Sequence, residues 1–227
     1  RATSGGVTSG DSDTRSVTTA EPNPVIATSG SLTARSATYG TASTAASFTL
    51  TGSEMAEAVN VAMPAGFEGS TNAASGFATN FNAGAAGDFS ATIYVRLAAT
   101  TSAGSYSGDI VLTSSGADTV TVATVESTVS AKVLTVTGLS AANKTYDGNT
   151  VVTVSGTAAF SGLVNGDDFT PAGSISWAFP NANAGLKTLT RTGGYDAPSA
   201  NYTVTQPTLT ATINAKALTV TGATADN

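Results

Sequence analysis

Short runs of alternating apolar and polar residues constrain the fold of this chain most strongly. Each run places every second side chain on one face of an extended strand, so that one face is buried and the other meets water. Clusters of Gly, Ser and Asn separate the runs, as turns between short strands require. The clearest runs are Ser47–Gly52, Val59–Met63, Ala91–Leu97, Asp109–Ser114 and Thr119–Thr124. The sequence therefore predicts an all-β protein built from antiparallel β-sandwich domains.

The composition argues against several classes of function. The chain has no Cys, which excludes disulfides, thiol catalysis and thiolate zinc sites, and no His, the commonest general base and transition-metal ligand. The net charge is −6 and the 9 Lys and Arg residues are scattered, so there is no basic patch for nucleic acid or anionic lipid. No apolar stretch approaches the ~20 residues of a membrane span. We therefore expect no catalytic, cofactor-binding or metal-binding residues, no cofactor, no nucleic-acid binding and no membrane insertion.

An internal repeat divides the chain. Residues 131–138 read AKVLTVTG and residues 215–222 read AKALTVTG, and the two copies begin 84 residues apart. Self-similarity at such a period indicates a repeated structural unit. We expect a polar extension (1–21), a β-sandwich (22–130), one complete β repeat (131–214), and the start of a further repeat or a terminal strand (215–227).

The complete unit resembles the YDG repeat of large bacterial surface and secreted proteins, including haemagglutinin-like adhesins. The residues that carry the resemblance are Leu134–Gly138, Asn143–Thr150, Gly162–Asp168 and Asn201–Val204. Residues 22–130 resemble the bacterial Ig-like modules that precede such repeats, through Pro64–Glu68, Thr92–Leu97 and Ala103–Gly108. These resemblances imply two tandem sandwich domains in an extracellular or cell-surface protein, with a β-grasp-like topology as the alternative for the second. They bring no active site with them.

Four residues stand out as structural motifs. Tyr106 follows Gly104 just before an expected strand, as in the tyrosine corner of sandwich folds, where the hydroxyl bonds to a nearby backbone group. We interpret Tyr146, Asp147 and Gly148 as a turn: the Asp bonds to its own backbone, the Gly adopts a positive φ and the Tyr ring packs on the sheet.

Two further features bear on binding. Asp167 and Asp168 are interpreted as solvated turn residues, as are Asp11 and Asp13; a Ca²⁺ site with backbone oxygens is the alternative for the first pair. Trp177 lies in an alternating strand, which favours a place in the core over display to a sugar.

The function expected from these observations is structural. An incomplete repeat at 215–227 exposes backbone groups that an edge of another subunit would satisfy, which favours a filament or surface-layer subunit that self-associates head to tail. A stalk or spacer segment of a large adhesin, in contact with neighbouring domains of a longer chain, explains the same feature equally well. A carbohydrate-binding module is the alternative of a different class.

Overall fold

The computed structural model describes residues 23–222, and every regular element in this range is a β-strand, which confirms the all-β prediction. None of the described residues belongs to a helix long and apolar enough to cross a membrane. The polar extension expected at 1–21, with Asp11 and Asp13, lies outside the described residues, as do residues 223–227 of the expected terminal segment.

The N-terminal half, residues 23–130, contains two four-stranded antiparallel sheets whose buried side chains share one core. Fully buried residues such as Leu50 and Ile93 come from one sheet, and Val61 and Leu112 from the other. The first sheet has the order β1 (Val25–Ser29), β3 (Ala46–Met55), β7 (Gly87–Leu97), β5 (Phe67–Ser70), and the second the order β10 (Val120–Ala123), β9 (Asp109–Thr113), β4 (Val59–Ala62), β6 (Asn80–Ala83).

Each of the five runs singled out in the sequence lies on one of these strands. The strands β3 and β7 are longer than expected, because β3 continues through Met55 past a register shift after Gly52, and β7 begins at Gly87. The buried positions of β3, Phe48, Leu50 and Gly52, keep the period of two that the alternation predicted.

A small sheet closes the N-terminal half at the end nearest the second half. Its order is β2 (Ser36–Thr38), β11 (Ser127–Ser130), β8 (Gly104–Tyr106), with β11 parallel to β2 and antiparallel to β8. The chain leaves this sheet along β11, and only Ala131 separates β11 from β12, the first strand of the second half.

The C-terminal half, residues 131–214, consists of three smaller sheets. Their orders are β14 (Val154–Ser161), β12 (Lys132–Ala141), β18 (Tyr202–Thr205); β13 (Lys144–Thr145), β19 (Thr210–Asn214), β16 (Gly185–Thr188); and β15 (Ile175–Ala178), β17 (Thr190–Gly193). Besides β2–β11, the parallel pairs are β12–β18 and β13–β19, a departure from the purely antiparallel pairing we expected. Two tandem sandwiches stay a prediction.

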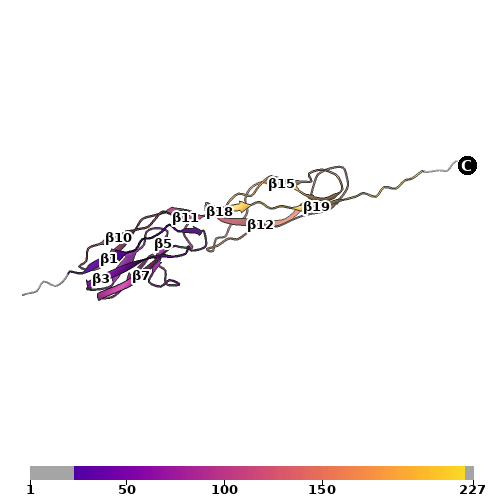
Figure 1. The fold of residues 1–227 in the computed structure, drawn as a ribbon. Coiled ribbons are helices and arrows are strands. Elements are labelled where there is room, and N and C mark those ends of the chain that lie inside the picture. The colour runs from indigo at the N-terminus through magenta and orange to yellow at the C-terminus, as the bar shows by residue number, and fades with distance from the viewer. Residues whose placement is uncertain (1–22, 223–227) are drawn as a thin grey trace, which may run out of the picture.

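The two halves lie end to end in an elongated molecule, with β11, β12 and β18 near their meeting point (Figure 1). The core of the N-terminal half continues across this point, because Leu134 of β12 and Tyr202 of β18 belong to the same buried cluster. A separate cluster lies at the far end of the C-terminal half, where Trp177 is half-buried and packs against a core that includes Phe179. This place agrees with the core position that the alternation favoured.

Candidate functional site

Two tyrosines and one aspartate form the centre of the contact between the halves, which we call the joint. Tyr39 follows β2 in the N-terminal half, and Tyr202 opens β18 in the C-terminal half. Their rings pack edge to face, with centroids 5.4 Å apart and an angle of 89° between the planes. Both hydroxyls donate to the same oxygen, Oδ2 of Asp167, at 3.1 Å from Tyr39 and 2.7 Å from Tyr202. The joint therefore combines aromatic packing with two hydrogen bonds to a charged acceptor.

Burial governs the electrostatics of the joint. Tyr202 is 2% exposed. Loss of solvent raises the pKa of its phenol above the usual value, and the charge of Asp167 adds to the rise, while the hydrogen bond from the Val164 backbone N–H acts in the opposite direction. The Tyr202 hydroxyl therefore stays protonated and remains a donor to the carboxylate throughout the neutral range.

A tight turn presents Asp167 to the two tyrosines. Asn165 and Gly166 both have positive φ values, 56° and 79°, and the Asp167 N–H donates to the Val164 carbonyl oxygen at 3.0 Å. Asn-Gly is the pair that favours this conformation. The expectation that Asp167 is a solvated turn residue is therefore wrong: it is half-buried and bound to two hydroxyls, whereas Asp168 is exposed.

The turn also contacts the backbone of the N-terminal half. The carbonyl oxygen of Ala99 accepts from the Gly40 N–H at 3.0 Å and from the Asn165 side-chain amide at 3.2 Å. Gly40 has a φ of 86°, and a Cβ at this position would overlap the Val164 side chain. A glycine is needed here both for the left-handed backbone and for the close approach of the turn.

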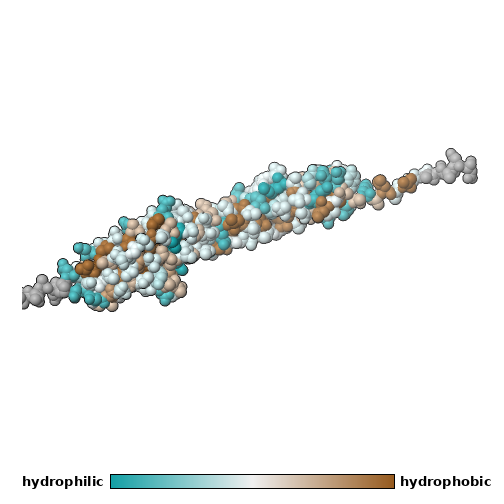
Figure 2. Space-filling view, viewed as in Figure 1, coloured by the Kyte–Doolittle hydropathy of each residue, from teal (hydrophilic) through white to brown (hydrophobic). Residues whose placement is uncertain are grey.

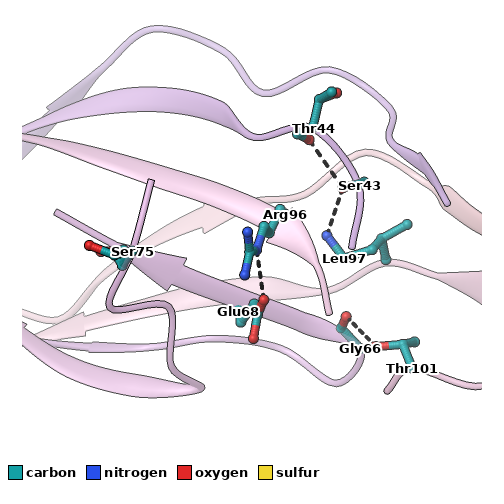
Figure 3. A network of polar contacts seen from close by, with 9 residues as sticks. Ser43, Thr44, Gly66, Glu68, Ser75, Arg96, Leu97 and Thr101 are labelled. Atoms are coloured by element: carbon teal, nitrogen blue, oxygen red, sulfur yellow. Dashed lines mark hydrogen bonds and ion pairs between the residues drawn. The ribbon is translucent and has the colours of Figure 1, made fainter. Parts of the chain in front are cut away.

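Side-chain hydrogen bonds hold the loop that carries Ala99. The Thr101 hydroxyl donates to the Gly66 carbonyl oxygen at 2.8 Å, and the Ser43 hydroxyl accepts from the Leu97 N–H at 2.9 Å (Figure 3). The ion pair between Arg96 and Glu68, at 2.7 Å, lies on the neighbouring strands β7 and β5 (Figure 3). All of these contacts lie within the N-terminal half, on the side that meets the C-terminal half.

Tyr106 supports the next part of the same loop. Its hydroxyl donates to the Ser102 carbonyl oxygen, four residues upstream, at 2.9 Å. The adjacent Ala103 N–H donates to Oδ1 of Asn201 at 2.8 Å, and the Asn201 carbonyl oxygen accepts from the Lys132 N–H at 2.8 Å. Asn201 therefore links the loop of the N-terminal half to the first strand of the C-terminal half.

The joint thus uses two segments of the C-terminal half, Gly162–Asp168 and Asn201–Val204, which are the segments that carried the resemblance in the sequence. A YDG domain spans residues 130–211. The unit expected from the internal repeat spans residues 131–214. No match is found among the curated proteins compared with the chain.

The Tyr146-Asp147-Gly148 segment of the YDG domain lies at the end opposite the joint. Oδ1 of Asp147 forms an ion pair with Lys144 at 2.7 Å and accepts from the Asn149 N–H at 3.1 Å, and these contacts lower the pKa of the carboxyl. Gly148 has a φ of 80°. The Tyr146 side chain is 44% exposed, whereas we expected its ring to pack on the sheet.

The contacts at the joint hold separate segments of the chain together, whereas those of Asp147 join residues within one turn. No three acidic side chains gather into a possible cation site anywhere in residues 23–222. The calcium alternative for Asp167 and Asp168 stays a prediction. Sequence reasoning missed Tyr39 altogether. The one available signal was its setting, Thr38-Tyr39-Gly40, which resembles Thr145-Tyr146-Asp147-Gly148 of the motif already noted.

Proposed function

We propose that this chain is a non-enzymatic spacer: a stiff stalk segment of an extracellular or cell-surface protein, made of an Ig-like β-sandwich and a YDG domain joined end to end. The joint of Tyr39, Asp167 and Tyr202 is the observation that carries the proposal. Independent motion is the default for two domains in one chain unless their contact is well packed. Here one core runs through the contact, and two buried hydroxyls share one carboxylate across it.

The covalent connection supports the same function. Flexible linkers are runs of several Gly and Ser residues, but here Ala131 alone separates the strands β11 and β12. Each of these strands is the central strand of its sheet, so hydrogen bonds on both sides restrain it. Bending at the joint would therefore break contacts in both domains, and the length of the molecule is maintained along the direction of the chain.

Small-angle X-ray scattering of the whole chain tests the spacer function. We expect the wild-type curve to fit a single elongated shape, and Tyr39→Ala to broaden the distribution of maximum dimensions because the aromatic contact and one hydrogen bond are lost. Tyr146→Ala is the matched control: it removes the same side chain at the far end and leaves the curve unchanged. A wild-type curve that requires a broad ensemble of interdomain angles would refute the proposal.

A filament subunit polymerised through the C-terminal segment is a second candidate. Leu218 and Val220 are 89% and 91% exposed, on a segment that extends from the end of the YDG domain (Figure 2). Residues 215–222 form no strand, so their backbone groups are open to an edge of another subunit. Negative-stain electron microscopy at several concentrations, with and without residues 215–227, separates the candidates. Regular fibres that disappear on deletion support the filament, and dispersed particles at every concentration exclude it.

A further inference from the structure

The far end of the YDG domain repeats the construction of the N-terminal half at the joint. In each place a central strand pairs in parallel with a short strand and antiparallel with a third strand, in the orders β2-β11-β8 and β13-β19-β16. The parallel pairs stand in the same register, with Ser130 opposite Thr38 and Asn214 opposite Thr145. Ser130 and Asn214 are also equivalent in the 84-residue repeat.

This equivalence places Tyr146 where Tyr39 stands. The Tyr39 N–H donates to the Ser130 carbonyl oxygen at 2.9 Å, and the Tyr146 N–H donates to the Asn214 carbonyl oxygen at 2.8 Å. Both tyrosines directly follow the short parallel strand of their sheet. Tyr39 is 7% exposed because the YDG domain covers it, whereas Tyr146 is 44% exposed.

The third strand shows the same correspondence. Gly104 pairs with Val129 in β11, and Gly185 pairs with Ile213 in β19, so the alanines that precede the two glycines are equivalent. At the joint, the N–H of Ala103 donates to the side chain of Asn201. At the far end, Ala184 is exposed and lines an open hollow together with Tyr146, Asp147, Gly148, Asn183 and Leu218.

The residues that follow the two central strands are also equivalent. After β11 come Ala131, Lys132 and the buried Leu134 of β12. After β19 the same residue types occur at Ala215, Lys216 and Leu218. Leu134 is fully buried, while Leu218 is 89% exposed. The segment after β19 thus has the sequence of a first YDG strand without the sheet that covers such a strand.

We propose that the Tyr146 end is a docking surface for a further YDG unit, of which residues 216–221 are the first strand. The tyrosine of that unit equivalent to Tyr202 packs edge to face on Tyr146, and its aspartate equivalent to Asp167 accepts from both hydroxyls. The asparagine equivalent to Asn201 accepts from the Ala184 N–H. The inference rests on the spacer function and gives the Tyr-Asp-Gly motif a role, the receiving side of a joint.

The occupant follows from the contacts already made. The YDG domain of a second copy of this chain is excluded, because its Tyr202 and Asp167 are already engaged by its own Tyr39. The two receiving ends differ in one respect. Tyr39 is followed at once by Gly40, which touches Val164, whereas Asp147 comes between Tyr146 and Gly148. A Cβ on Gly148 would meet no atom within 4 Å, so the longer turn leaves room for an incoming loop.

The test is a chain in which residues 1–222 are followed by a copy of residues 139–214 that carries Tyr146→Phe. The copy completes the second unit and leaves a single Tyr146 to be nitrated. Tyrosine nitration, located by mass spectrometry, is compared with that of the original chain. We expect the nitration rate of Tyr146 to fall to that of Tyr39, about sixfold if it follows the exposed fractions of 44% and 7%. The substitution Asp167→Ala in the added copy alone should restore the reactivity of Tyr146, and Asp168→Ala in that copy is the matched control.

Amide hydrogen exchange of residues 216–221 completes the test, because these amides become protected only if the added unit folds. Protected amides with Tyr146 still as reactive as in the original chain would overturn the docking. Unprotected amides would overturn the assignment of 216–221 as a first strand. The nitration of Tyr39 in the original chain separates the two proposals. A reactive Tyr39 would refute the spacer function. A protected Tyr39 together with either of these results would refute only the inference about the Tyr146 end.

Discussion

The substitution Asp167→Ala isolates the polar contribution of the joint. It removes the acceptor of two hydroxyls, those of Tyr39 at 3.1 Å and Tyr202 at 2.7 Å. A hydrogen bond to a charged group contributes about 1.5–3 kcal/mol, and a buried donor left without an acceptor costs about 1–3 kcal/mol. The Tyr202 hydroxyl keeps a weaker acceptor, the Val164 carbonyl oxygen at 3.4 Å. We therefore expect a total loss of about 2–4 kcal/mol in the free energy of unfolding.

Urea denaturation of the full chain measures this loss, with circular dichroism for both halves and Trp177 fluorescence for the YDG domain. Asp168→Ala is the matched control, because it removes the neighbouring, exposed carboxylate and should change the free energy of unfolding by no more than about 0.5 kcal/mol. Asp167→Asn keeps an uncharged acceptor oxygen and should lie between the two.

A double-mutant cycle with Tyr39→Phe then tests whether the loss belongs to the contact between the halves. Tyr39→Phe keeps the ring that packs on Tyr202 and removes only the hydroxyl. If the hydroxyl and the carboxylate interact, the double variant is less destabilised than the sum of the single variants by about 1 kcal/mol. Additive effects, or an Asp167→Ala loss no larger than that of Asp168→Ala, would show that the carboxylate does not hold the joint.

Three further outcomes follow from single residues. Gly40→Ala should lower the free energy of unfolding by about 1–3 kcal/mol more than Gly87→Ala. Both glycines have a φ near 85°, but only a Cβ on Gly40 would meet another side chain, that of Val164. Equal losses in urea denaturation would contradict the close approach of Gly40 to Val164. Because the folded state raises the pKa of Tyr202, its contribution to stability is complete below about pH 10 and is lost as the pH rises through the folded pKa. Unfolding curves between pH 9 and 11, which are about one unit either side of the usual tyrosine value, should show this loss, and Tyr202→Phe should reduce it. Trp177 fluorescence should be blue-shifted and insensitive to added glycans; a shift that depends on a sugar would favour the carbohydrate-binding alternative.

The strands of the N-terminal half could be predicted from the sequence because they depend on local alternation. Phe48 and Leu50 of β3 are buried two residues apart, as any half-buried strand requires. The parallel pair β12–β18 could not be read in the same way, since it joins Lys132 to Tyr202, and nothing local specifies a partner so distant in sequence.

The contacts of the joint could not be predicted from the sequence for a related reason. Asp167 lies in an Asn-Gly turn, which in isolation predicts a solvated position, and only the packing of Tyr39 and Tyr202 around it makes the carboxylate a half-buried acceptor. Burial of a polar group is set by what packs on it, so a turn motif cannot reveal it. Likewise, the Tyr-Asp-Gly motif has the conformation of a turn whether or not its tyrosine is covered.

The arrangement of the sheets explains why aromatic residues and a shared acid occupy these positions. The chain passes from the centre of one sheet to the centre of the next, so the strands themselves set the direction of the molecule, and Ala131 alone remains as a hinge. Rotation about one residue is opposed best by contacts to either side of the strand. Tyr39 with Tyr202 provides one such contact, just after β2, and Ala103 with Asn201 provides another, just before β8; β2 and β8 are the two neighbours of β11. Tyr146 and Ala184 occupy the equivalent positions on either side of the end of β19. Any domain that follows β19 would therefore meet the same pair of restraints.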